Sequence, residues 1–168
     1  MSASLRSLVA LMVAVVWTLS ACSGGDTHVD VDADPPSAPD LSAPEPAVRS
    51  YLDWVSFAYR MANSEIPVDT MTGNQYVRVD AYIELNRQNG EGLEQELVDF
   101  EAHDVSEEAT SAVVTAREEW RFRYFNLDTL RYTSERERAE YETVYALVLE
   151  DGRWLVDGVE AELLGTSD

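Results

Sequence analysis

The chain has 168 residues, 12 basic and 32 acidic side chains, a formal net charge of −20 and a single Cys. Such an acidic balance argues strongly against nucleic acid and anionic lipid surfaces as partners, because a surface that binds phosphates needs clustered basic residues. One Cys excludes an intrachain disulfide, and the length is enough for one domain with a real core.

All 12 basic side chains other than His are Arg, with no Lys anywhere in the chain. Two interpretations stay open. The bias reflects either a GC-rich genome or adaptation to high salt, where screening relieves the repulsion among the acidic groups. Halophilic adaptation predicts that the domain gains stability between low and molar salt.

Residues 1–21 are predicted to be a signal peptide, with Arg6 as its positive start and residues 8–19 as its apolar core. The tetrapeptide Leu19-Ser20-Ala21-Cys22 that ends it resembles the lipobox of bacterial lipoproteins, in which cleavage precedes a Cys that is then lipidated. The resemblance implies a protein anchored to a membrane of the bacterial cell envelope through Cys22, on the periplasmic side of the outer membrane or at the cell surface. The alternative is a plain signal peptide or an uncleaved anchor, with Cys22 incidental.

Residues 22–45 are rich in Gly, Pro, Ser, Ala and Asp, a composition that predicts a flexible acidic tether between the lipid and the domain. Asp residues alternate along its first half. A calcium loop counted from Asp30 would need Gly and a carboxylate where Pro35 and Leu41 stand. No metal site is therefore expected here, and the sequence carries no motif that indicates a cofactor.

The domain at residues 46–168 is expected to open with a helix that begins near Pro46. Its apolar side chains recur at helical spacing and form a stripe of Val48, Leu52, Val55, Tyr59 and Ala62. A second helix is expected over residues 74–89, stopped by Gly90. Its expected inward side chains are Tyr76, Val79, Tyr82 or Ile83, and Leu85.

The periodicity then changes from helical to alternating, which predicts strands at residues 93–102 and 110–125. The polar segment 103–108 between them, which contains His103, is predicted to be a turn. In the second strand, alternation places Val114, Ala116, Glu118, Trp120, Phe122 and Tyr124 on one face. The opposite face carries Arg117, Arg121 and Arg123, which are expected to pair with Glu140 and Glu142 or to form a cationic patch for an acidic partner.

Residues 139–163 are predicted to form a β-hairpin closed on Asp151-Gly152, because both turn residues need positive φ. A two-residue turn pairs Leu147 with Val156 and Tyr145 with Gly158. The core face then carries Tyr141, Tyr145, Leu147, Leu149, Trp154 and Val156. The other face, with Val144, Val148, Leu155 and Val159, is also partly apolar and is a candidate homodimer surface.

These elements predict an α+β fold in which N-terminal helices pack in the concavity of a curved, mostly antiparallel four-stranded sheet. The layout resembles the nuclear-transport-factor-2-like cone. Three segments are similar to strands of its membrane-anchored relatives, including teicoplanin-resistance-associated and plastid-division IMS-type domains. They are Val114-Thr115-Ala116-Arg117-Glu118-Glu119-Trp120, residues 141–147, and Asp151-Gly152-Arg153-Trp154-Leu155-Val156.

The resemblance implies that an enzyme of this fold would be an isomerase, dehydratase or cyclase with an acid or base inside the cone and Tyr donors beside it. Glu118 is the candidate acid or base, with Tyr141 and Tyr145 as candidate donors. The alternative places Glu118 at the rim or against an Arg, or turns it outward through a bulge between Ala116 and Trp120. Candidate pocket residues are Trp54, Trp120, Tyr124 and Trp154.

The sequence contains no nucleophile-base pair, phosphate loop or Cys/His metal cluster. It therefore favours a non-catalytic envelope lipoprotein whose cone binds a protein partner or a small apolar ligand. A small-molecule isomerase or hydrolase that uses Glu118 is the alternative.

Overall fold

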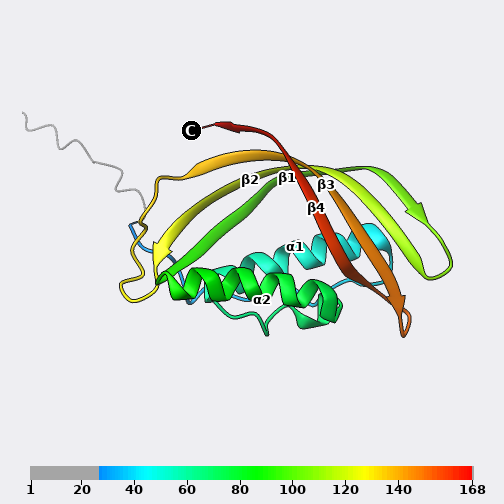
Figure 1. Ribbon diagram of the computed structural model, residues 1–168, viewed down its shortest axis with the longest axis horizontal. Coiled ribbons are helices and arrows are strands. Elements are labelled where there is room, and N and C mark those ends of the chain that lie inside the picture. Colours follow the sequence, from blue (N-terminus) through cyan, green and yellow to red (C-terminus); the bar gives the residue numbers. More distant parts are fainter. Residues whose placement is uncertain (1–26, 168) are drawn as a thin grey trace, which may run out of the picture.

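The computed structural model describes residues 27–167, so the predicted signal peptide and Cys22 lie outside the described residues. The elements in chain order are α1 (Pro44–Met61), the short 3-10 helix η1 (Val68–Thr70), α2 (Gly73–Gln88), β1 (Glu91–Glu107), β2 (Ser111–Asn126), β3 (Glu137–Glu150) and β4 (Arg153–Ser167). The four strands form one antiparallel meander in the order β1-β2-β3-β4. Both helices lie on the concave side of this curved sheet (Figure 1), which confirms the predicted α+β architecture.

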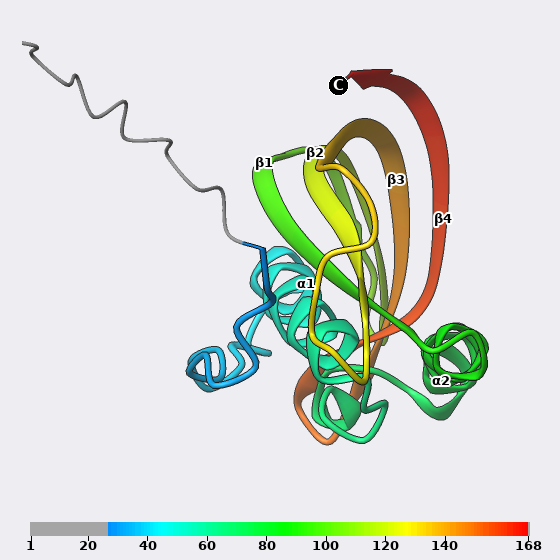
Figure 2. The same cartoon turned by 90° about the vertical axis from the view of Figure 1, so that its left-hand side faces the viewer.

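Helix α1 follows the expected amphipathic pattern and runs beneath β1 (Figure 2). It begins two residues before Pro46, with Pro44 in its first turn, where a missing N–H costs nothing. It ends at Met61 and is capped by Ala62, whose φ of 48° is left-handed and whose N–H bonds back to the carbonyl of Ala58. Its buried face carries Ala47, Val48, Tyr51, Leu52, Val55 and Ala58, which form the core together with the inner faces of the strands.

Helix α2 buries a narrower face than the sequence pattern predicts. Val79 and Ile83 are each only 2% exposed, as expected, but Leu85 is 57% exposed, so its predicted inward position is wrong. The geometry of the helix gives the reason. Two residues correspond to about 200° of rotation, which places Leu85 nearly opposite Ile83.

Strand β1 is longer and less regular than predicted. It continues to Glu107, and its pairing with β2 shifts register at Val98 and again at His103. Each bulge reverses the alternation, so Leu97 and Phe100 both contact the core. His103 therefore lies in a strand, where its Nε2 is 2.9 Å from a carboxylate oxygen of Glu142, and not in the predicted turn.

The β3–β4 hairpin turns on Asp151-Gly152 as predicted, with φ values of 50° and 77°. Leu147 pairs with Val156, but a bulge at Asp157 then shifts the register, so that Tyr145 pairs with Val159. The predicted pairing of Tyr145 with Gly158 is wrong for this reason. The bulge also turns Val159 away from the outer face, where alternation had placed it, and toward the sheet's concave side.

Part of the segment expected to be a tether contacts the domain. Val29 and Leu41 are 5% and 8% exposed. The N–H of Val29 bonds to the carbonyl of Leu130, and the carbonyl of Leu41 accepts from Trp154 N–H at 2.9 Å. The chain is thus packed against the sheet well before Pro46.

Candidate functional site

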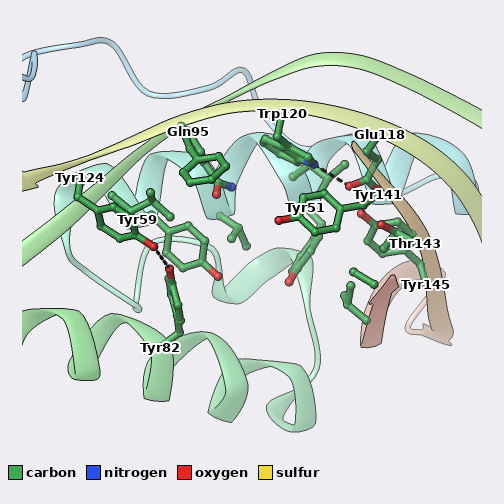
Figure 3. A pocket seen from close by; sticks show the side chains of 16 residues that line it. Tyr51, Tyr59, Tyr82, Gln95, Glu118, Trp120, Tyr124, Tyr141, Thr143 and Tyr145 are labelled. Carbon is green, nitrogen blue, oxygen red and sulfur yellow. Dashed lines mark hydrogen bonds between the residues drawn. The ribbon is translucent and has the colours of Figure 1, made fainter. Parts of the chain in front are cut away.

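A cavity of about 340 Å³ lies between the two helices and the concave face of the sheet. Aromatic side chains dominate its lining (Figure 3). The full set is Tyr51, Leu52, Val55, Tyr59, Tyr82, Leu93, Gln95, Glu118, Trp120, Phe122, Tyr124, Tyr141, Thr143, Tyr145, Val159 and Ala161. We call this the aromatic cavity. Its size and apolar lining are those of small-molecule sites.

Glu118 is the one acidic side chain in the lining, and it is only 3% exposed. Strand β2 continues without a bulge from Ala116 to Trp120, so the alternation of the strand aims Glu118 inward. The hydroxyl of Tyr145 donates to one of its carboxyl oxygens, and the indole Nε1 of Trp120 donates to the other at 2.8 Å. No Arg contacts this carboxyl among residues 27–167.

Burial raises the pKa of the Glu118 carboxyl, and hydrogen bonding by Tyr145, Trp120 and Thr143 opposes part of that shift. Burial and the neighbouring Glu118 carboxyl together hold the pKa of Tyr145 well above its ordinary value. Burial also raises the pKa of Tyr51 to about 12, although a hydrogen bond from Gln75 opposes the shift. Tyr145 and Tyr51 are therefore neutral at pH 7.

The Glu118 end of the aromatic cavity also holds the buried hydroxyl of Thr143. This hydroxyl lies close enough to Glu118 and Tyr145 to lower the pKa of both, although its Oγ1 makes no hydrogen bond of normal geometry in the described part of the chain. A polar group that is only weakly paired can accept or donate a bond to a bound molecule. Thr143 is therefore a third polar group, with Glu118 and Tyr145, at this end of the cavity.

The opposite end of the cavity is formed by three tyrosines (Figure 3). The hydroxyls of Tyr82 and Tyr124 are 3.2 Å apart, and the rings of Tyr59 and Tyr82 have centroids 5.2 Å apart. Burial is the main cause that raises the pKa of Tyr59 and Tyr124. Helix α2 thus contributes a polar group at one end of the cavity, while β2 and β3 contribute those at the other.

The structure brings together most of the residues singled out in the sequence. Glu118, Trp120, Tyr124, Tyr141 and Tyr145 all line the aromatic cavity. Two of the predicted pocket residues do not. Trp54 lies on the outer side of α1 and donates its indole N–H to the carbonyl of Ser37 at 3.1 Å, whereas Trp154 is 4% exposed in the core.

Other lining residues were missed by sequence reasoning. Thr143 could have been found, because it lies between Tyr141 and Tyr145 in the same alternating strand. Gln95 and Val159 carried no such signal. Each points into the cavity in a register that a bulge interrupts, at Val98 for β1 and at Asp157 for β4.

Residues 27–167 include no group of three or more His, Cys, Asp or Glu side chains placed to hold a metal ion. Within the same range no helix is both long and apolar enough to cross a membrane.

No family model matches the chain, and no curated protein matches it. The intermembrane space region of the chloroplast protein ARC6 has a similar structure, with a TM-score of 0.64 and 18% identity over 76% of this chain and 99% of that one. It shares the fold of this chain. A ketosteroid isomerase-like protein from Erwinia carotovora has a TM-score of 0.48 and 18% identity, over 74% of this chain and 96% of its own. A calcium/calmodulin-dependent protein kinase II association domain from Xanthomonas campestris, described as putative, has a TM-score of 0.48 and 12% identity, over 78% of this chain and 95% of its own.

At 18% identity the likeness to the ARC6 domain shows the shared α+β cone and assigns no activity.

Proposed function

We propose that this protein is a lipoprotein of the bacterial cell envelope, anchored through Cys22, whose cone domain binds a small, mostly apolar molecule without transforming it. The aromatic cavity carries this proposal. The concavity retains about 340 Å³, half of whose lining residues are aromatic, and this size and lining fall within the range of small-molecule sites. Sequence alone supports the anchor, through the lipobox that ends at Cys22.

The lining defines the chemical class of the ligand. Aromatic faces favour a flat or ring-containing apolar body. Thr143 offers a hydroxyl at one end of the cavity and Tyr82 and Tyr124 offer hydroxyls at the other, so a ligand with a neutral polar group at each end matches best. A carboxylate or phosphate beside Glu118 is disfavoured, because it would add a second acidic group to a buried carboxyl.

N-phenyl-1-naphthylamine, a compact neutral dye that fluoresces in apolar surroundings, is a suitable probe. We expect saturable fluorescence with the purified protein. Ala161→Trp, at the exposed rim of the cavity, should weaken dye binding about tenfold or more by filling space. Glu160→Trp is the matched control, because the preceding residue of β4 points to the opposite face. Equal dye binding by both variants would refute the cavity as the binding site.

The anchor has its own test. Wild-type protein expressed in a bacterial host should fractionate with membranes, and Cys22→Ala should abolish labelling by a radioactive fatty acid. Labelling that persists in Cys22→Ala would exclude this Cys as the lipidated residue.

Proton transfer by Glu118 is the second candidate function, favoured by one observation. Its carboxyl is buried in an aromatic cavity with a raised pKa, which is how a general acid or base is tuned toward neutral pH. Both of its oxygens already accept hydrogen bonds, which favours binding over catalysis. Exchange of the α-protons of 1-indanone in D₂O, followed by NMR, separates the two. Exchange accelerated by wild type and abolished in Glu118→Gln would make the domain an enzyme.

A further inference from the structure

We infer that a second cavity, at the C-terminal end of α1, binds a single phosphate-type oxyanion. This cavity of about 110 Å³ is lined by Arg60, Glu94, Glu96, Arg121, Phe122, Arg123 and Arg136, and we call it the basic cavity. Residues from α1, β1, β2 and the β2–β3 connection therefore meet there. It is separate from the aromatic cavity, with which it shares only Phe122.

The charge of the basic cavity is opposite to that of the molecule. Four guanidinium groups face two carboxylates, whereas the whole chain has a formal charge of −20. Four of the chain's 12 basic side chains gather at this one place. Such a local excess of positive charge attracts anions, most strongly where the site is partly removed from solvent.

The two carboxylates do not use up the available donors. Glu94 accepts from Arg123 Nε at 2.8 Å and from the Tyr132 hydroxyl at 2.9 Å, and Arg136 lies 4.0 Å from it. Glu96 lies 3.3 Å from a terminal nitrogen of Arg121. These contacts also correct the expected pairing of the arginines of β2 with Glu140 and Glu142. Arg121 and Arg123 pair instead with glutamates of the neighbouring strand β1. A guanidinium has five N–H donors, so most of those on Arg60 and Arg121 are not engaged by these carboxylates.

Two of these donors are buried and unpaired. Nε of Arg60 and Nε of Arg121 have no hydrogen-bond partner in the described part of the chain. Arg60 forms no ion pair within residues 27–167 either. A buried N–H without an acceptor costs about 1–3 kcal/mol, and more when it belongs to a charged group. A bound oxyanion supplies the missing acceptors in the geometry that guanidinium groups favour.

The size of the basic cavity limits the ligand. About 110 Å³ is well below the roughly 300 Å³ at which pockets for drug-sized ligands begin. That space suits one phosphate or sulfate, or the terminal phosphate of a larger molecule whose remainder stays outside. The side chain of Arg136 is 46% exposed, so this guanidinium of the basic cavity is accessible from solvent.

The test is thermal unfolding of the protein, purified in detergent, at increasing inorganic phosphate while NaCl is lowered to keep the ionic strength constant. We expect a saturable rise in Tm, because a ligand that binds only the folded state stabilises it. Arg60→Gln should weaken phosphate binding and so raise the half-saturating phosphate concentration about tenfold. Arg78→Gln is the matched control, since it removes the same charge from an exposed position on α2 that lines neither cavity.

A Tm that does not respond to phosphate at constant ionic strength would overturn the inference, as would equal losses in Arg60→Gln and Arg78→Gln. If Arg60→Gln fails to fold, Arg136→Gln removes a more exposed guanidinium of the same cavity and should also weaken the response. Glycerol 1-phosphate distinguishes the source of the oxyanion. Saturation at a lower concentration than inorganic phosphate would assign a phosphate ester such as a lipid headgroup, and saturation at an equal or higher concentration would assign the free ion.

Discussion

Glu118 shows how a single residue joins the fold to the proposed function. Its burial follows from the alternation of β2, and its two hydrogen bonds come from Trp120 on the same strand and Tyr145 on the next. A carboxyl in this position costs stability when it ionises, which a purely structural core would avoid by using an apolar residue. Its place in the lining of an otherwise aromatic cavity is consistent with a role in ligand binding.

Glu118 predicts a pH dependence of stability. Because its folded-state pKa is raised above the ordinary value of 4.5, its contribution to stability is fully present below that value and is lost as the pH rises through the folded pKa. Glu118→Gln lacks this titration, so its free energy of unfolding should improve relative to wild type between pH 4 and pH 8. Urea unfolding of both proteins across this range measures the difference. A difference that stays constant would contradict the prediction.

Gly92 makes a prediction about close packing. A Cβ on this residue would lie 2.2 Å from the ring of Phe125, which is 0% exposed and has little room to move. Gly92→Ala should therefore cost about 1–3 kcal/mol of unfolding free energy, as overpacked sites do. Gly165→Ala in β4, where nothing lies within 4 Å, is the control and should change stability by less than about 0.5 kcal/mol. Equal effects of the two substitutions would show that backbone entropy, not contact with Phe125, decides the result.

Among the elements, the bulges determine which side chains reach the cavity. The bulge at Asp157 turns Val159 inward. Asp157 itself also accepts hydrogen bonds from residues at the start of α2. The Thr72 hydroxyl donates to the Asp157 carboxylate at 2.6 Å, and the Asn74 amide donates to the Asp157 carbonyl at 2.9 Å. The same local distortion thus shapes the cavity wall on β4 and positions the helix that carries Tyr82.

The segment before α1 makes a second prediction at this scale. Leu41→Ala should lower the free energy of unfolding by about 2 kcal/mol or more, because Leu41 is 8% exposed and belongs to the core cluster. Leu85→Ala, on the exposed side of α2, should change it by no more than about 0.5 kcal/mol. Denaturant unfolding compares the two. A small effect at Leu41 would show that the segment is a tether after all.

For the whole molecule, the acidic charge is the main electrostatic feature. Exposed carboxylates repel one another at low salt, and added salt screens them. If the composition reflects adaptation to high salt, Tm should rise by roughly 4 °C, or about 1 kcal/mol, between 0.05 M and 2 M NaCl. A flat Tm would leave genome composition as the explanation for the Arg and acidic bias.

The outer face of the hairpin remains a predicted dimer surface, although it is less apolar than the sequence indicates. Leu155 is buried within the chain, Val159 lines the cavity, and Val144 remains 39% exposed. Sedimentation of the purified protein measures the oligomeric state. Dissociation caused by Val144→Glu would place the interface on this face, and a strict monomer would exclude it.

The sequence by itself determined the elements and most of one wall of the cavity. Helical spacing identified α1, the Asp151-Gly152 turn identified the hairpin, and the alternation of β2 aimed Glu118, Trp120 and Tyr124 inward. These features are local, because a period or a turn is set by residues a few positions apart.

Only the tertiary structure decided the rest. The bulges at Val98, His103 and Asp157 break the period of two and are specified by packing. The bulge at Asp157 reverses the expected orientation of Val159, and the bulge at His103 lets β1 continue through the segment that was predicted to be a turn. The basic cavity combines Arg60 of α1 with Arg121 of β2, which are 61 positions apart in the chain. No local sequence pattern predicts that these two side chains lie close together, because their proximity depends on how a helix packs along the edge of a curved sheet.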